Sequence, residues 1–353
     1  MSKGVKRKQS SAVNNLLYFM IVLAIMFILY MLYEEDIQSF LGKDKKEIVK
    51  QEVKQEQVVQ SNDDWYFRNE RFYQKYRLIT EYIVDVKSPL NKVLITAPYP
   101  THQKNLQYIL DLDVQPQETR IVEKDGNKYF QFELNDVVPN KYKFFVATDV
   151  AIRKYDILTA KQFNRNVTPE YDLTRYLLSE KNINVESLYL KEVADNIYGS
   201  TQEELVQNIL NYIQKNIKYT TNVMNIDAEH VIKSKEAFCT GFASLMTALC
   251  RIKKIPARVV AGNVVKDGKD SKHNWVEVYY KEYGWVTYDP TYFVFDSNNE
   301  LKIQQERTEA TKRDYFVWGY NVFTGWRVDM TSDTEIHNPI LIDDTFQVVP
   351  LNN

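Results

Sequence analysis

The stretch EAFCTGFASLMTALC, residues 236–250, contains both cysteines of the 353-residue chain. Apolar residues recur through it after Cys239, which predicts a helix over residues 236–253 that begins close to this cysteine. In a continuous helix, the distance along the axis from Cys239 to Cys250 is about 16 Å. A disulfide requires Cα atoms within about 7 Å of each other. We therefore exclude a disulfide between the two cysteines.

The two cysteines differ in their sequence surroundings. Cys250 falls in an apolar stripe with Leu245, Met246 and Leu249, so we interpret it as a small core residue. Cys239 stands at the predicted helix start, where free backbone N–H groups and the positive end of the helix dipole stabilise a thiolate. The same N–H groups could hold an oxyanion. Cys239 is therefore a candidate nucleophile, with simple packing as the alternative.

A nucleophilic thiol needs a base and a group that orients the base. The segments HNWVEVYY (273–280) and GWVTYDP (284–290) predict two strands joined by a turn at Gly284. Residues opposite each other in a hairpin share a face, and 273 plus 289 is even. His273 and Asp289 therefore face each other only if the loop has an odd number of residues or a bulge, which Gly284 suits. We predict the triad Cys239, His273 and Asp289. The alternatives are a polar edge histidine and an aspartate that starts a turn.

Metal and cofactor sites are not expected. Zinc sites use Cys and His at short spacing, and the four histidines at 102, 230, 273 and 337 are scattered along the chain. The net charge of −2, from 45 basic and 47 acidic residues, also predicts no nucleic-acid partner.

Two longer segments, EAFCTGFASLMTALCRIKKIPARVVAG (236–262) and HNWVEVYYKEYGWVTYDPT (273–291), together resemble the core of the transglutaminase-like superfamily. The resemblance spans about residues 200–292. The chain departs from the family pattern at Ala237-Phe238, before the cysteine, and at Lys254, where a glycine is usual before Ile-Pro.

The resemblance implies an α+β, papain-like core in which a helix headed by the cysteine packs on an antiparallel sheet. It implies that Cys239 attacks a carboxamide or peptide carbonyl, that His273 polarises the thiol and protonates the leaving amine, and that Asp289 holds the imidazole. The reaction would pass through an acyl-enzyme and end in hydrolysis, as in a protease or amidase, or in transamidation. The sequence does not decide between these outcomes.

The N-terminal segment predicts a membrane anchor. Residues 16–33 carry no charge over 18 positions, a length of about 27 Å that is close to the thickness of a bilayer core. Basic residues precede this run and three acidic residues follow it, so we expect 1–13 in the cytoplasm, a transmembrane helix over 14–33 and the rest outside. A cleaved signal peptide is the alternative.

The remaining chain divides by composition. Residues 34–62 are polar and predict a stalk. Residues 65–160 contain short alternating runs, with Asp125-Gly126 as a hairpin turn, and predict a β-sandwich domain. We place the catalytic core at 165–292, with helices expected over 168–180 and 200–217, and a β-leaning extension without an assigned role at 293–353.

Two functions remain open at this point. The first is a single-pass, membrane-anchored enzyme that acts outside the cell on a peptide or protein substrate. The second is a non-catalytic scaffold that uses the same fold to bind proteins or peptides at the cell surface. The sequence does not predict the oligomeric state.

Overall fold

The computed structural model describes residues 70–103, 106–116, 119–153, 157–163, 172–222, 225–291, 313–321, 329–332 and 339–351. The chain divides into two units, 1–56 and 57–353, and all of these residues belong to the second. The predicted membrane helix (14–33) and stalk (34–62) lie outside the described residues. Among the described helices, none has the length and apolar character that a membrane crossing needs.

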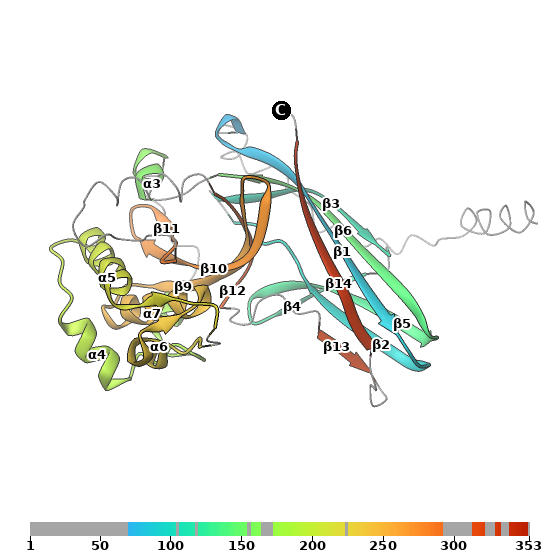
Figure 1. Cartoon of the computed structure of the whole chain (residues 1–353). Helices are drawn as coiled ribbons and strands as arrows, with labels where there is room; N and C mark the ends of the chain where they lie inside the picture. Colours follow the sequence, from blue (N-terminus) through green and yellow to red (C-terminus); the bar gives the residue numbers. More distant parts are fainter. Residues whose placement is uncertain are drawn as a thin grey trace, which may run out of the picture. The chain divides into compact units, whose positions relative to one another are not determined.

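Two four-stranded sheets contain the strands that precede the catalytic core (Figure 1). The first sheet has the order β14-β1-β6-β3, with bounds Pro339–Pro350, Gln74–Val86, Asn140–Ile152 and Gln107–Gln115. The second sheet has the order β13-β2-β5-β4, with bounds Asp329–Ser332, Leu90–Pro98, Asn127–Val137 and Arg120–Lys124. A short 3-10 helix, Glu70–Phe72, precedes β1.

Buried side chains of both sheets form one hydrophobic cluster. The cluster includes Val84 of β1 and Phe144 of β6 from the first sheet, and Val93 of β2 and Phe132 of β5 from the second. The rings of Phe132 and Phe144 lie 4.7 Å apart between centroids, so the two sheets meet directly. Alternation of apolar and polar residues produces this arrangement, because successive side chains of a strand point to opposite faces.

The hairpin turn predicted at Asp125-Gly126 is confirmed. Lys124 pairs with Asn127, so the loop between β4 and β5 has two residues. Both loop residues have positive φ, 53° for Asp125 and 75° for Gly126, which is the geometry of a type I′ turn.

A third sheet carries the candidate catalytic residues. It is antiparallel, with the order β11-β10-β9-β12 and bounds Gly284–Tyr288, Lys269–Tyr280, Ala257–Lys266 and Asp314–Tyr320. Helix α7 (Cys239–Ile252) packs on β9 and β10, and α4 (Leu188–Asp195), α5 (Gln202–Asn216) and α6 (Ala228–Ser234) pack against α7 (Figure 1). The smaller elements are α3 (Ile157–Phe163) and the parallel pair β7 (Lys218–Tyr219) and β8 (Glu236–Ala237).

The helices follow their local capping signals. The helix predicted over 200–217 is present as α5, with the Thr201 hydroxyl accepting from the Glu204 N–H at 3.1 Å. The sequence analysis missed α3, α4 and α6. Of these, α4 and α6 begin after the capping side chains of Ser187 and Asp227. Both are short, so their apolar periodicity is weak.

The helix predicted over 168–180 is wrong in its described part, which contains only a 3-10 turn, Thr174–Leu177. Oδ1 of Asp172 accepts hydrogen bonds from the N–H and the hydroxyl of Thr174, and Leu178 is extended, with φ −91° and ψ 161°. Local side-chain bonds of this kind compete with helix formation. The remainder of the predicted helix, up to residue 171, lies outside the described residues.

The C-terminal residues add one edge strand to each of the three sheets. Strand β12 completes the third sheet, β14 the first and β13 the second. A smaller apolar cluster that includes Leu78 of β1 and Phe316 and Trp318 of β12 joins the first sheet to the third. The sheet that carries the candidate site is thus packed against the strands that precede it in the chain.

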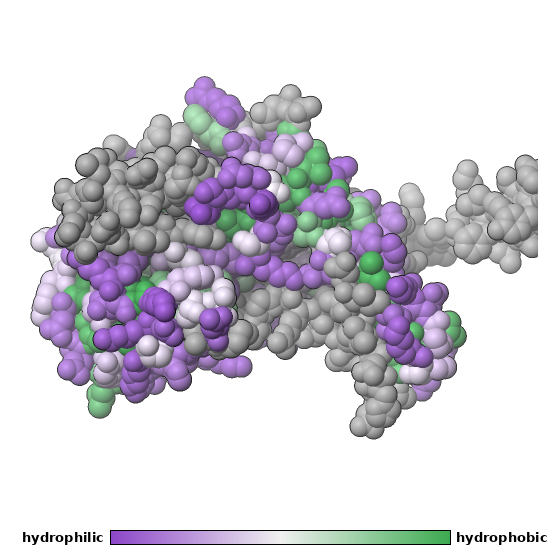
Figure 2. All heavy atoms as spheres, in the orientation of Figure 1, coloured by the Kyte–Doolittle hydropathy of each residue, from purple (hydrophilic) through white to green (hydrophobic). Residues whose placement is uncertain are grey.

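The described surface around the helices is mainly hydrophilic. Figure 2 shows hydrophobic residues on this face only as small patches between hydrophilic ones. The most exposed large apolar side chains are Leu188, which is 83% exposed, and Tyr198, which is 73% exposed.

Candidate functional site

Cys239 is the first residue of α7, as the sequence predicts. Phe238 occupies the capping position and makes no side-chain cap hydrogen bond. The N-terminus of a helix carries a partial positive charge and N–H groups without helical partners, so this position favours an anion. Cys239 is partly exposed, whereas Cys250 is buried, and both thiols are free.

Gly241 allows neighbouring segments to approach the first turn of α7 closely. A Cβ at this position would lie 2.6 Å from the carbonyl oxygen of Asn225, 2.7 Å from Cβ of Ala237 and 2.9 Å from a methyl group of Val231. Real Cβ atoms do not approach so closely, so only glycine fits. The small residue two positions after Cys239 therefore lets the start of the helix pack closely on its neighbours.

The loop of the hairpin β10–β11 has three residues, an odd number as the predicted triad requires. Tyr280 pairs with Gly284, which has a φ of 75°, and Val276 pairs with Tyr288. Continuing this register brings Asp289 opposite Trp275, two residues from His273 and therefore on the same face of the sheet. Nε2 of His273 lies 2.8 Å from Oδ2 of Asp289, and their side chains are only 4% and 2% exposed.

The imidazole of His273 also contacts the thiol of Cys239. His273 and Cys239 share a hydrogen bond. Because Nε2 of His273 is directed at Asp289, Nδ1 is the nitrogen left for the sulfur. The structure thus brings together all three residues of the predicted triad, and their catalytic role stays a prediction.

The electrostatics of the site favour a charged pair. Burial opposes ionisation of Cys239, but the hydrogen bond and charge of His273, with smaller contributions from the Asn274 N–H and the Thr240 hydroxyl, hold the pKa of the thiol below its ordinary value. Burial also disfavours a charged imidazole, but Asp289 and Cys239 together raise the pKa of His273 to about 10. At neutral pH, these two shifts favour a thiolate beside an imidazolium.

Cys250 shows the opposite behaviour in the same helix. Its complete burial raises the pKa of the thiol to about 12. The interpretation of Cys250 as a core residue is confirmed by this burial and by its place in the main hydrophobic cluster. The chain therefore contains an internal reference thiol for Cys239.

Thr240 and Asn274 tie the start of α7 to β10, and the sequence analysis did not single them out. The Thr240 hydroxyl donates to Oδ1 of Asn274 at 2.7 Å, and Nδ2 of Asn274 donates to the carbonyl of Val260 at 3.1 Å. Each directly follows a triad residue in the sequence. Their only signal in the sequence is that proximity.

Trp275 packs beside the imidazole. Its ring is stacked on His273, with centroids 6.2 Å apart and an interplanar angle of 20°, and the side chain is fully buried. Gly262 lies against it, because a Cβ there would be 2.6 Å from the Trp275 ring and 2.0 Å from the carbonyl oxygen of Phe316. Trp285 is also buried and packs on Arg258, so neither tryptophan is an open wall of the site.

Asp289 has two further donors that the sequence analysis did not anticipate. The N–H of Thr291 donates to Oδ1 at 3.0 Å, and the Tyr315 hydroxyl donates to Oδ2 at 2.8 Å. Tyr315 comes from β12, beyond the segment that resembles a known family. No local motif marks it, since it is one of 25 tyrosines.

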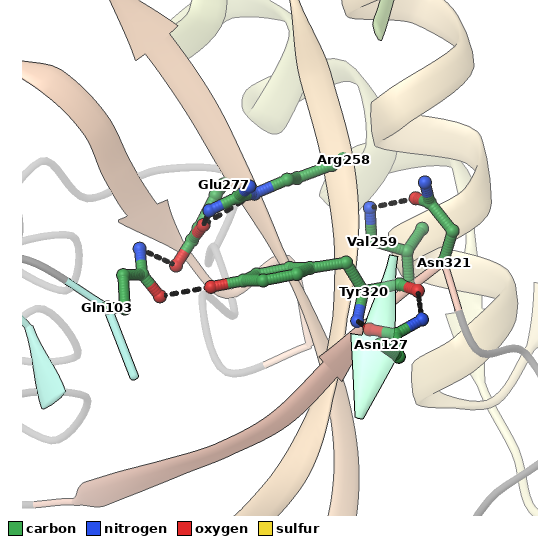
Figure 3. A network of polar contacts seen from close by, with 7 residues as sticks. All are labelled: Gln103, Asn127, Arg258, Val259, Glu277, Tyr320 and Asn321. Atoms are coloured by element: carbon green, nitrogen blue, oxygen red, sulfur yellow. Dashed lines mark hydrogen bonds and ion pairs between the residues drawn. The ribbon is translucent and has the colours of Figure 1, made fainter. Parts of the chain in front are cut away.

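A buried polar network holds the strand that carries His273 (Figure 3). Arg258 donates two hydrogen bonds to Oε2 of Glu277, at 2.8 and 2.6 Å, and Gln103 donates to Oε1 at 2.8 Å. The Tyr320 hydroxyl donates to Oε1 of Gln103 at 2.6 Å, and the Arg258 guanidinium lies 3.6 Å from the centre of the Tyr320 ring. Because Gln103 lies between β2 and β3, the network joins β10 to β9, to β12 and to the segment that connects β2 with β3.

Two further histidines, His102 and His230, lie in the described part of the chain and are not members of the triad. His102 packs on Tyr108, His230 lies in α6, and His337 is outside the described residues. Within the described part of the chain, His, Cys, Asp and Glu form no group that could hold a metal ion.

Comparisons with known proteins show which family and which proteins this chain resembles. The sequence model of the Transglutaminase-like superfamily matches residues 191–290, which include Cys239, His273 and Asp289. An uncharacterized protein of Bacillus subtilis, YebA, is 26% identical over 204 residues, which are 50% of this chain and 27% of that protein. A protein-glutamine gamma-glutamyltransferase of Pseudomonas aeruginosa is 32% identical over 87 residues, which are 22% of this chain and 13% of that protein.

The chain thus spans about a quarter or less of the length of these two relatives. Among solved structures, a Cytophaga hutchinsonii protein named "Putative Cysteine Protease" matches with a TM-score of 0.50 and 18% identity. The match covers 79% of this chain and 98% of that one. At this identity the likeness shows the fold, in which helices and sheets are both present.

Proposed function

We propose, from the premise that residues 191–290 are a domain of the transglutaminase-like superfamily, that the protein is a cysteine-nucleophile enzyme acting on peptide or amide bonds. The observation that carries the proposal is the position of Cys239 at the start of α7, hydrogen-bonded to an imidazole that Asp289 holds. A nucleophile, a base and an orienting group within hydrogen-bond reach are what acyl transfer needs.

The reaction follows from these positions. The Cys239 thiolate attacks the carbonyl carbon, and the developing oxyanion is met by the backbone N–H of Cys239 at the helix N-terminus. The His273 imidazolium then gives its proton to the leaving amine, and a thioester remains on Cys239. Asp289 keeps Nε2 of His273 occupied, so that Nδ1 serves the sulfur and the leaving group.

The fate of the thioester defines the enzyme class. Attack by water yields an acid, as in a protease or amidase, and attack by an amine yields a new amide, as in a transamidase. The names of similar proteins include both a cysteine protease and a glutamyltransferase. We propose the shared first half of the reaction and leave its second half to experiment.

The experiment is to trap the acyl-enzyme. The full chain is exposed to candidate peptides in H₂¹⁸O with and without a primary amine, and the Cys239 peptide is analysed by mass spectrometry. An acyl adduct on Cys239 supports the enzyme, with ¹⁸O in the product indicating hydrolysis and amine incorporation indicating transamidation. Peptides that bind tightly and are neither attached nor altered would favour the non-catalytic scaffold.

We also propose that the enzyme is anchored in the cell membrane through residues 14–33, with its N-terminus in the cytoplasm. The support is the uncharged run over 16–33 and the charges on either side of it. The two sheets that share a core fit the β-sandwich expected over 65–160, which would stand outside the membrane with the catalytic domain. Protease added to intact cells should digest this part, and full protection would reverse the orientation.

A further inference from the structure

Tyr315 and His273 bind the same oxygen atom of Asp289. The Tyr315 hydroxyl donates to Oδ2 at 2.8 Å, and Nε2 of His273 lies 2.8 Å from that oxygen. The other oxygen, Oδ1, accepts from the N–H of Thr291 at 3.0 Å. Donors on both oxygens fix the plane of the carboxylate, so that Oδ2 stays directed at the imidazole.

The position of Tyr315 is itself well determined. Strand β12 pairs with β9 so that Tyr315 lies opposite Val264, and its neighbour Asp314 accepts from the Tyr76 hydroxyl at 2.8 Å. The Tyr315 ring meets Trp275 edge to face, with centroids 5.1 Å apart, and Trp275 in turn stacks on His273. Tyr315 therefore contacts Asp289 through its hydroxyl and Trp275, which packs on His273, through its ring.

We propose that Tyr315 is a positioning residue of the triad, supplied by the C-terminal extension, which holds Oδ2 of Asp289 on Nε2 of His273. The inference rests on the proposed function of Cys239. It goes beyond the family resemblance, because β12 lies outside the matched residues 191–290. It also gives the C-terminal extension a role in the site.

Two physical effects of the hydroxyl have opposite signs, so they can be separated. If the hydroxyl positions the carboxylate, Tyr315→Phe lets Asp289 rotate away from the imidazole. The imidazolium of His273 is then less stable, and it stabilises the Cys239 thiolate less. If the hydroxyl only neutralises negative charge, its loss leaves a stronger counter-charge for the imidazolium and stabilises the thiolate further. Alkylation by iodoacetamide reports the difference, because the thiolate is the reactive form.

The test measures the rate of Cys239 alkylation from pH 4 to 10 in the full chain by mass spectrometry of its peptide. We expect Tyr315→Phe to move the midpoint of the profile to higher pH and to lower the rate at pH 6 about tenfold, from the strength of a hydrogen bond to a charged group. Asp289→Asn is measured as a reference, because it gives the shift in the midpoint that follows from complete loss of the negative charge beside His273. The phenylalanine keeps the ring contact with Trp275, and a thermal melt verifies that each variant is folded.

Tyr76→Phe is the matched control, since it removes a tyrosine hydroxyl from a different aspartate, Asp314 of β12. A midpoint that moves up in Tyr315→Phe and stays in Tyr76→Phe supports the proposal. Equal shifts in both variants, an unchanged midpoint or a lowered midpoint in Tyr315→Phe would overturn it. A wild-type Cys239 that titrates like an ordinary thiol would overturn the proposed function itself, and this outcome is visible before any variant is compared.

Discussion

Nε2 of His273 lies 2.8 Å from Oδ2 of Asp289, although sixteen positions separate the two residues in the chain. The three-residue loop between β10 and β11 produces this contact, because the resulting register puts both side chains on the same face of the sheet. The contact leaves Nδ1 of His273 for Cys239. The orientation of the imidazole, and with it the ionisation of the thiol, thus depends on the length of one loop.

The first prediction concerns the charge of Asp289. Asp289→Asn removes the main cause of the raised pKa of His273, so the imidazolium should titrate closer to its ordinary range. We expect the rate of acyl-enzyme formation at neutral pH to fall by about 10²- to 10⁴-fold, the usual contribution of acid–base catalysis. NMR titration of the His273 ring measures the pKa directly. An unchanged value would show that Asp289 does not stabilise the imidazolium.

The second prediction is a wide pH window for activity. The thiolate–imidazolium pair forms as pH rises through the lowered pKa of Cys239 and is lost as pH rises through the pKa of His273, about 10. The rate of acylation should therefore rise below the ordinary thiol range and fall only in strongly alkaline solution. A profile that rises once, at an ordinary thiol pKa of about 8.5, would show that the pair does not form.

The third prediction concerns the close packing at Gly262. Gly262→Ala inserts a methyl group that meets both the Phe316 carbonyl and the Trp275 ring, so β9 and β12 must separate and the indole must move. We expect a loss of about 3 kcal/mol in the free energy of unfolding and slower alkylation of Cys239.

Gly268→Ala serves as the control for that prediction. Gly268, unlike Gly262, has a positive φ, of 73°, and nothing lies within 4 Å of the added methyl group. The backbone strain costs about 1 kcal/mol, and the reactivity of Cys239 should not change. Equal effects of the two variants on alkylation would argue against the link from Gly262 through Trp275 to His273.

The fourth prediction concerns the buried ion pair in Figure 3. Glu277→Gln leaves Arg258, whose side chain is 5% exposed, without its carboxylate partner. Removing one member of such a pair costs about 3–5 kcal/mol, measured by urea unfolding. Asp344→Asn removes the exposed partner of Lys272 near the same strand and should cost under about 1 kcal/mol. Comparable costs would mean that the network does not hold β10.

The sequence predicted those parts of the site that depend on short-range patterns. The helix start at Cys239, the assignment of Cys250 to the core and the three-residue loop before Gly284 are all local features, and the structure contains each of them. The helix over 200–217 was predicted for the same reason. The helix over 168–180 was predicted wrongly because the side chain of Asp172 binds the backbone that a helix would use.

Other parts of the site depend on contacts between distant residues. Tyr315 reaches Asp289 from a strand that follows the core, and Gln103 reaches Glu277 across 174 positions. Neither residue lies in a motif, and tyrosine and glutamine are common in many other roles. Only the order of strands in the sheets brings Tyr315 to Asp289 and Gln103 to Glu277, and no periodicity in the sequence specifies that order.

The central claim is that Cys239 is a nucleophile activated by His273, and alkylation at pH 6 tests it most directly. The rate constant for iodoacetamide is measured for Cys239 in the full chain, in its His273→Ala variant and in N-acetylcysteine as a reference thiol. The account predicts that wild-type Cys239 reacts faster than the free thiol and that the variant loses this advantage, while buried Cys250 stays unlabelled. A wild-type Cys239 that reacts no faster than N-acetylcysteine, or a variant that reacts as fast as wild type, would contradict the account.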